Sequence, residues 1–428
     1  YFFGRIFYFF FSSRRRHTRC GEIFLFFLAP NSHEDILALQ KNLFCRILIT
    51  LGVPPLKVAL LEKEESVAQT VRTSGVTWID YAKESGIPED CYNPIRTYNF
   101  CSPNNIASIS DDEPKAAVLD VRKTFRFLAD QAKKNGAEIF VNTNVTEVIT
   151  ENGKIVGVKA SSSNNEMIFR AKMVIDASGF QSVVSKSLGL VKQWKRFGVG
   201  AEYEAEVENV NADTWWLMVG QMYSPAGYAW IFPLGKNLVR IGVGIGKPES
   251  EVDPTERLDE LIEKGAGPIK DLGKITKKEF HYGLIPNEGL SRKTVYDNLI
   301  LVGDTAGMAN PLVLEGIRYA IKYGRVAGDT ASKAIKSGDT SEKALRHYEE
   351  TWKKEIEPKI KSAHKVQTRW LGLSDGDWDK EIDMISNLTA DEFLDFIRAD
   401  FTVSKIVKLA THHPMLAVRQ LFNIVKGA

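Results

Sequence analysis

The most constraining feature of this 428-residue sequence is a strand pattern that ends at a carboxylate and leads into a helical pattern. The strand covers Leu299–Val302, Asp304 follows Gly303, and the helical pattern covers about Leu314–Lys336. A strand that leads into a helix is the building unit of an α/β sheet. The helix start points back at the strand end, where backbone amides at Gly316 and Ile317 can stabilise negative charge. The run therefore predicts an α/β domain with a ligand site at this edge.

Other patterns fill in the rest of the chain. A helix with its stop at Gly136 is predicted over Ala117–Asn135. The predicted strands of the α/β part are Lys57–Glu62, Glu138–Asn142, Val145–Thr150, Lys154–Ala160 after a turn at Asn152-Gly153, and Met173–Asp176. Alternating patterns such as Val199–Val207 and Leu238–Val243 predict an inserted antiparallel sheet.

These changes of pattern divide the chain into parts, and a prior of about 150 residues per domain allows two or three domains. The predicted parts are an anomalous segment (1–50), the first part of a cofactor-binding α/β domain (51–194), an antiparallel-sheet substrate domain (195–285), the second part of the α/β domain (286–338) and a C-terminal helical lobe (339–428).

Composition excludes several classes of protein. The net charge of +2 carries no electrostatic footprint of a nucleic-acid binder, so we expect no nucleic-acid partner. The cysteines, Cys20, Cys45, Cys91 and Cys101, all fall in the first quarter of the chain, which excludes a disulfide scaffold. A reducing compartment fits this usage, so we expect a cytoplasmic protein.

Residues 1–30 differ sharply from the sequence that follows, because two short aromatic runs flank the basic block Arg14–Arg19. This order is not that of a signal peptide, and neither run approaches the roughly 20 apolar residues of a membrane span. We interpret the segment as a damaged or chimeric start. The alternative is a basic, aromatic anchor at a membrane surface.

Glu62, at the end of the strand Lys57–Glu62, is the residue type that binds ribose hydroxyls of a dinucleotide at the carboxyl edge of a parallel sheet. Its usual companion is a glycine-rich turn about 20 residues earlier, where bare backbone approaches the pyrophosphate. The sequence has no glycine between Gly21 and Gly52. This absence is the main objection to cofactor binding.

The run Asn298–Ala320 resembles the flavin-binding end of FAD-dependent oxidoreductases of the geranylgeranyl reductase family, in the para-hydroxybenzoate hydroxylase-like group. The resemblance covers about residues 56–428 and implies FAD as cofactor. It implies a hydrogen bond from a ribityl hydroxyl to Asp304, and charge stabilisation by the amides of Gly316 and Ile317.

Further segments match the family in order. They are Glu62, the second FAD-contacting stretch Val71-Arg72-Thr73-Ser74-Gly75, the helix-borne cofactor arginine Arg122, Val145, whose backbone would meet the adenine, and the turn Asp176-Ala177-Ser178-Gly179. By themselves, Arg122 would be a solvated helix residue and Asp176 part of an ordinary turn.

The stretch Pro225–Pro233 contains Tyr228, Trp230 and Phe232 in period-two register, which puts the three rings on one face of a strand. Alone, this pattern indicates a sheet packing on its own core. It resembles the Pro-x-x-Tyr-x-Trp-x-Phe-Pro signature, ending at Pro233, by which geranylgeranyl reductases form an isoprenoid pocket, and differs from the signature of flavin-dependent halogenases.

The resemblance implies FAD-dependent reduction of isolated double bonds in prenyl chains of membrane lipid precursors. It implies a prenylated lipid substrate, an electron donor that is NADPH or a small redox protein, and a peripheral membrane contact. The alternatives are a flavin-dependent monooxygenase or halogenase, and a non-functional remnant without the glycine-rich loop.

No catalytic residue is assigned from the sequence. Many family members carry Cys where this chain has Thr73, so Cys91, Cys101, His281 and Tyr282 are the candidate proton donors, with a structural role favoured for both cysteines. Adjacent His412 and His413 do not face the same side of a helix, so no metal site is predicted.

Overall fold

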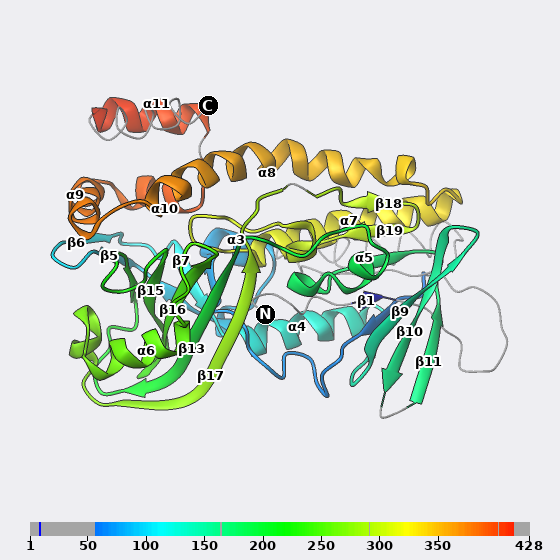
Figure 1. The fold of residues 1–428 in the computed structure, drawn as a ribbon, viewed down its shortest axis with the longest axis horizontal. Coiled ribbons are helices and arrows are strands. Elements are labelled where there is room, and N and C mark those ends of the chain that lie inside the picture. The colour runs from blue at the N-terminus through cyan, green and yellow to red at the C-terminus, as the bar shows by residue number, and fades with distance from the viewer. Residues whose placement is uncertain (1–7, 10–55, 163–164, 291, 401, 415–428) are drawn as a thin grey trace, which may run out of the picture.

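The structure is a computed structural model that describes residues 8–9, 56–162, 165–290, 292–400 and 402–414 (Figure 1). Apart from the two-residue strand β1 (Tyr8–Phe9), the expectations for residues 1–50 lie outside the described residues. The glycine-free span after Gly21 and two of the cysteines, Cys20 and Cys45, fall there as well.

A six-stranded sheet forms the centre of the α/β domain, in the order β18-β19-β12-β1-β2-β8. Two of its neighbouring pairs, β2 with β8 and β12 with β19, are parallel. Helices α4 and α7 both contribute side chains to the apolar core of this sheet, and in Figure 1 α7 lies beside β18 and β19 while α4 lies below them. The bounds are β2 Ala59–Leu61, β8 Glu138–Phe140, β12 Val174–Asp176, β18 Val295–Tyr296, β19 Leu299–Leu301, α4 Val121–Lys134 and α7 Ile317–Ser337.

The strand order places β1 where a doubly wound nucleotide-binding sheet has its first strand. In such a sheet the first strand runs parallel to its neighbours. Here β1 is antiparallel to both, because Tyr8 pairs with Leu61 on β2 and with Asp176 on β12. The central position of the sheet is therefore occupied by backbone that runs in the opposite direction.

A seven-stranded sheet forms the second layer, in the order β17-β13-β16-β15-β14-β5-β6. Its strands are antiparallel except for the pair β14–β5. The sheet reaches beyond the predicted insertion of residues 195–285, because β5 and β6 come from earlier in the chain. The bounds are β5 Thr97–Cys101, β6 Ile106–Ser110, β13 Phe197–Val207, β14 Thr214–Met218, β15 Gly227–Gly235, β16 Leu238–Lys247 and β17 Ile275–Pro286.

The described residues also form two three-stranded sheets, with the strand orders β11-β10-β9 and β3-β7-β4. The second corrects the predicted helix Ala117–Asn135, because Ala116–Leu119 forms β7 and the helix α4 begins only at Val121, after the N-cap Asp120. A short, fully buried apolar run fits a strand as well as a helix, so periodicity cannot separate them. The bounds are β3 Val76–Trp78, β4 Tyr92–Ile95, β9 Asn144–Glu151, β10 Lys154–Ser162 and β11 Asn165–Arg170.

Helices after residue 341 form the predicted lobe, which covers one face of the seven-stranded sheet, while α6 (Pro254–Glu263) covers the other (Figure 1). The lobe contains α8 Glu342–Trp370, α9 Asp375–Ile385, α10 Ala390–Ile397 and α11 Val403–His412. Two further helices of the described residues are short: α3 Ile79–Glu84 and α5 Val183–Ser187. In the described part of the chain, every helix is too short or too polar to cross a membrane.

Candidate functional site

Two buried carboxylates lie just beyond neighbouring parallel strands, and their surroundings differ. Asp176, at the end of β12, accepts hydrogen bonds from the backbone and hydroxyl of both Ser178 and Ser185, at 2.6–3.1 Å. Asp304 follows β19, and its Oδ2 atom has no hydrogen-bond partner among the described residues. Burial raises the pKa of Asp304 well above its usual range. Asp176 therefore holds its own turn together, whereas Asp304 keeps one acceptor oxygen without a donor among the described residues.

The start of α7 lies next to Asp304, because the chain turns back through residues 307–316. The 3₁₀ turn Gly303–Ala306 begins with Gly303 at φ +65°, and α7 begins after Gly316. Glycine offers no capping side chain, so the amides of the first turn need other acceptors. Glu315 supplies one, since its Oε1 accepts from the Arg318 amide at 3.3 Å.

This arrangement fits the flavin that the sequence implies. A buried carboxylate oxygen without a partner calls for a hydroxyl donor, and a helix start without a capping side chain calls for partial negative charge. A ribityl chain and the pyrimidine end of an isoalloxazine offer these two groups. Asp304, Gly316 and Ile317 are therefore brought together as the sequence predicts, while Leu314 and Glu315 precede the helix instead of belonging to it.

The other predicted cofactor residues have described partners. Glu62, directly after β2, accepts the Glu64 amide at 2.9 Å. Arg72 pairs with Glu64 at 3.3 Å. Arg122 donates to the carbonyl oxygens of residues 68 and 69 and to Glu279, so it joins α4 to the stretch before Arg72. Val145 is buried on β9 and pairs with residue 160.

The aromatic residues of β15 form a wall, as their spacing predicts. Trp230 and Phe232 are stacked, with ring centroids 5.9 Å apart and planes at 15°, and Tyr228 lies 5.6 Å from Trp230. The Tyr228 hydroxyl donates to the Val313 carbonyl at 2.6 Å, which ties the wall to the loop before α7. Pro233 lies on the opposite face by alternation, and its carbonyl accepts from a side chain on β4.

Glycines from three strands form the floor beside this wall. In the register, Gly198 of β13 is opposite Gly246 of β16, and Gly200 is opposite both Gly244 and Gly283. Gly242 is opposite Trp230, and a Cβ there would come within 2.3 Å of the indole ring. The period-two glycines of β13 and β16 were a visible sequence signal that the sequence analysis did not use. Because glycine has no side chain, these positions leave space on one face of the sheet for a flat or thin ligand.

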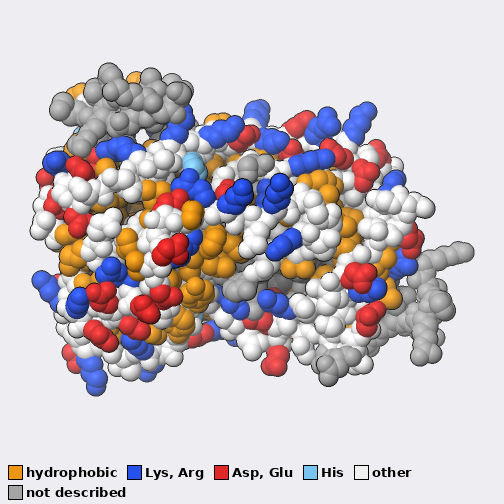
Figure 2. Space-filling model, viewed as in Figure 1, with side chains coloured by type: hydrophobic (Ala, Val, Ile, Leu, Met, Phe, Trp, Pro, Cys, Tyr) orange, Lys and Arg blue, Asp and Glu red, His pale blue; other side chains and the backbone are white. Residues whose placement is uncertain are grey.

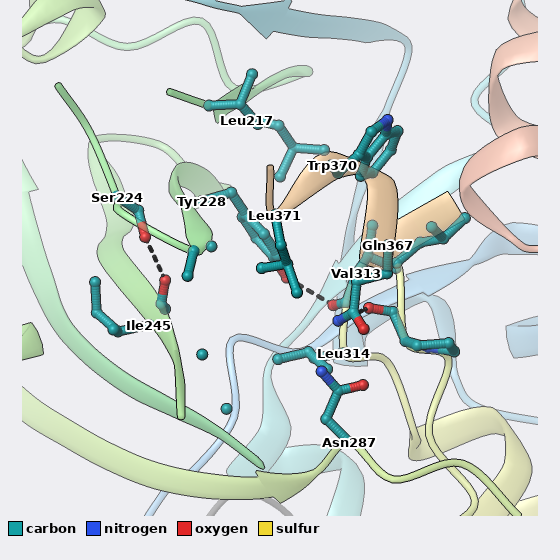
Figure 3. Close-up of a pocket in the computed structure, with 18 of the residues that line it drawn as sticks. Leu217, Ser224, Tyr228, Ile245, Asn287, Val313, Leu314, Gln367, Trp370 and Leu371 are labelled. Atoms are coloured by element: carbon teal, nitrogen blue, oxygen red, sulfur yellow. Dashed lines mark hydrogen bonds between the residues drawn. The ribbon is translucent and has the colours of Figure 1, made fainter. Parts of the chain in front are cut away.

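An apolar cavity lies between this floor and the helical lobe. Leu217, Tyr228 and Ile245 line it from the sheet, Val313 and Leu314 from the loop before α7, and Trp370 and Leu371 from the end of α8 (Figure 3). Its volume is about 90 Å³. A cavity of about 150 Å³ holds one benzene molecule, so this smaller cavity takes a chain of several carbon atoms when side chains such as Leu314 move. Figure 2 shows apolar side chains exposed between the lobe and the sheet.

Predicted cofactor residues meet this cavity at one end. Ser74 lines it, and both Thr73 and Ser74 line a smaller cavity of about 30 Å³ that continues to Phe232 and Glu315. The Arg240 guanidinium donates to the carbonyls of Ser74 and Leu119 at 2.9 and 3.0 Å. Both cavities reach the loop before α7, because Val313 and Leu314 line each of them.

A buried ionic cluster supports the aromatic wall. Glu202 accepts a hydrogen bond from Trp230 Nε1 at 2.8 Å through Oε2, and His281 Nδ1 lies 2.9 Å from its Oε1. Arg240 lies 3.7 Å from Glu202 and 3.3 Å from Glu204. Glu202, Arg240 and His281 are each only 2% exposed, so the Glu202 carboxylate and the Arg240 guanidinium are balanced within the cluster and not by water.

The candidate proton donors fall in different places. Burial raises the pKa of Cys91 to about 11 and that of Cys101 to about 12, and both thiols belong to apolar cores. Tyr282 is 37% exposed, on the sheet face opposite His281. Of the four candidates, only His281 lies on the cavity face of the sheet, behind Trp230.

Family comparisons agree with this geometry. Residues 198–279, which carry the aromatic wall and the β13 and β16 glycines of the floor, match the geranylgeranyl reductase catalytic domain. Residues 101–203 match an FAD-binding domain. The predicted cofactor, FAD, is confirmed by this match.

Individual relatives cover most of the chain. Digeranylgeranylglycerophospholipid reductase 2 of Methanococcoides burtonii is 31% identical over 361 residues, which are 82% of this chain and 87% of that protein. The digeranylgeranylglycerophospholipid reductase of Methanocaldococcus jannaschii is 32% identical over 331 residues, 76% of this chain and 83% of its own length. A solved geranylgeranyl bacteriochlorophyll reductase-like protein from Thermoplasma acidophilum shares the fold, with a TM-score of 0.77, 24% identity, and coverage of 94% of this chain and 98% of that one.

Proposed function

The chain belongs to the family of FAD-dependent digeranylgeranylglycerophospholipid reductases, and on that premise we propose that its apolar cavity holds the prenyl chain whose double bonds it reduces. The observation that carries this placement is the glycine floor facing the Trp230 wall, with Ser74 at the end where the flavin ring fits. The enzyme is thus a reductase of prenyl chains in membrane lipid precursors.

Reduction of an isolated double bond adds a hydride to one carbon and a proton to the other, and the bound flavin supplies the hydride. The chain's own residues provide position and environment. Asp304 and the start of α7 hold the cofactor, Arg240 holds the Ser74 loop, and the wall and floor align the prenyl chain and exclude water. The electron donor is NADPH or a small redox protein, and a peripheral contact with the membrane brings the lipid substrate to the cavity.

Anaerobic reoxidation tests the assignment. The FAD-loaded protein is reduced and mixed with a geranylgeranylated lipid, and the flavin absorbance should return as the double bonds are consumed. Aromatic compounds should give no such response, which separates the reductase from the monooxygenase and halogenase alternatives. A purified chain without the flavin absorbance band would instead support the non-functional remnant. Co-sedimentation with anionic lipid vesicles tests the membrane contact separately.

A further inference from the structure

Three side chains with metal-binding atoms meet in the helical lobe, away from the cavity and the α/β domain. Glu392 lies in the first turn of α10, His412 is the last residue of α11, and His413 follows it. One ligand atom from each of the three lies within 4.8 Å of the others. Within the ranges that the structure describes, it is the one such His/Cys/Asp/Glu group found.

Both imidazoles are directed at the same carboxylate. His412 Nδ1 lies 2.9 Å from Glu392 Oε1, and His413 Nε2 lies 3.2 Å from Glu392 Oε2. Neighbouring residues on a continuous helix point about 100° apart, which is why the sequence predicted no metal site. The structure departs from that reasoning because α11 ends at His412. His413 has φ −133° and ψ 68°, outside the helical region, so its ring turns back toward Glu392.

Hydrogen bonds from Thr389 fix the position of the Glu392 carboxylate. The Thr389 amide and hydroxyl both donate to Glu392 Oε2, at 3.0 and 2.9 Å, in a capping box at the start of α10. The Glu392 side chain is 6% exposed, whereas that of His412 is 51% exposed. Metal-binding carboxylates are usually oriented by such outer hydrogen bonds. The exposed side leaves a position for a water ligand.

Two imidazole nitrogens and one carboxylate are the protein ligands of open, four-coordinate zinc sites. Zinc bonds of about 2.0–2.1 Å at tetrahedral angles put ligand atoms roughly 3.3 Å apart. The two distances to Glu392 are close to this value.

We propose that Glu392, His412 and His413 bind a divalent transition metal of the zinc type, with water as a further ligand. Imidazole and carboxylate donors suit Zn²⁺ and its neighbours, not Mg²⁺ or Ca²⁺. The metal links the end of α11 to the start of α10. Its role is therefore to stabilise the helical lobe, which covers the cavity. It takes no part in the flavin chemistry.

Zinc titration of the untagged, chelator-stripped full-length protein tests the proposal. One equivalent of Zn²⁺ should bind in competition with a fluorescent chelator, and Co²⁺ should give the visible absorption bands of a tetrahedral site. His412→Ala and His413→Ala should each weaken binding by at least about 10- to 100-fold, the loss seen even for outer-shell partners. His347→Ala, an exposed histidine on α8, should leave the affinity unchanged.

The proposal is overturned if the wild-type protein binds no Zn²⁺, or if the His412→Ala/His413→Ala double variant binds it with the same affinity. Should one single variant misfold by circular dichroism, the other variant and the Co²⁺ spectrum of the wild type still decide. Flavin content is measured in parallel. It should be equal with and without zinc, so the outcome is independent of the prenyl reductase assignment.

Discussion

The hydrogen bond from Trp230 to Glu202 offers a direct test of how the aromatic wall is held. Trp230→Phe removes the donor but keeps an aromatic ring on β15. Glu202 Oε2 then loses its one hydrogen-bond partner among the described residues. Because Glu202 is buried, water cannot readily replace the indole N–H.

The expected cost has two parts. A hydrogen bond to a charged group contributes about 1.5–3 kcal/mol. The smaller ring leaves unfilled space above Gly242, which costs about 1 kcal/mol more. Trp230→Phe should therefore lower the free energy of unfolding by about 2.5–4 kcal/mol.

Trp215→Phe is a matched control, because Trp215 is equally buried and its Nε1 atom has no partner among the described residues. It loses the same volume without a hydrogen bond, so the difference between the two variants isolates the bond. Urea unfolding followed by circular dichroism measures both. Prenyl turnover should fall in Trp230→Phe while FAD stoichiometry stays at the wild-type value.

Equal losses for the two variants, within about 0.5 kcal/mol, would refute the reasoning. Trp230 would then be held by packing alone. Loss of FAD together with turnover would show instead that the wall is part of the general core and not of a substrate pocket.

Four further variants, one of them a control, test the other parts of the site. Asp304→Ala should weaken FAD binding roughly 10- to 150-fold in a flavin fluorescence titration. Burial raises the pKa of Asp304, so the stability of the apoprotein should fall as the pH rises from about 4 through the folded-state pKa. The Asp304→Ala variant should lose this dependence of stability on pH. Gly242→Ala should lower the free energy of unfolding by about 1–3 kcal/mol, because its Cβ would overlap the Trp230 ring, whereas Gly244→Ala, whose added Cβ meets Trp230 at 3.5 Å, should change stability little; equal losses of stability would contradict the close packing of Trp230 on Gly242. Leu314→Ala should lower the KM for prenyl lipid by enlarging the cavity above Gly198, and an unchanged KM would exclude Leu314 as the obstruction.

Local patterns predicted much of the fold and the cofactor end of the site. The strand Leu299–Leu301, the turn at Gly303 and α7 are close in sequence, so spacing alone places Asp304 beside the helix start. The predicted helix was wrong at Ala116–Leu119, which forms a strand. This run is buried throughout, so its apolar residues show neither a helical nor a strand period. The prediction also missed β5 and β6 as members of the large sheet, because strand partners far apart in sequence leave no local signal.

The sequence by itself determined segments with a clear period, such as the strand Leu299–Leu301 and most of α7, and that three aromatic rings share one face of β15, because these depend on neighbours along the chain. Only the tertiary structure showed that Asp176 accepts from Ser178 and Ser185 while Asp304 Oδ2 has no partner among the described residues. It also decided that Glu202 meets Trp230, and that Glu392 meets two histidines. Such pairs are set by sheet register and by where a helix ends, which are properties of the packed chain.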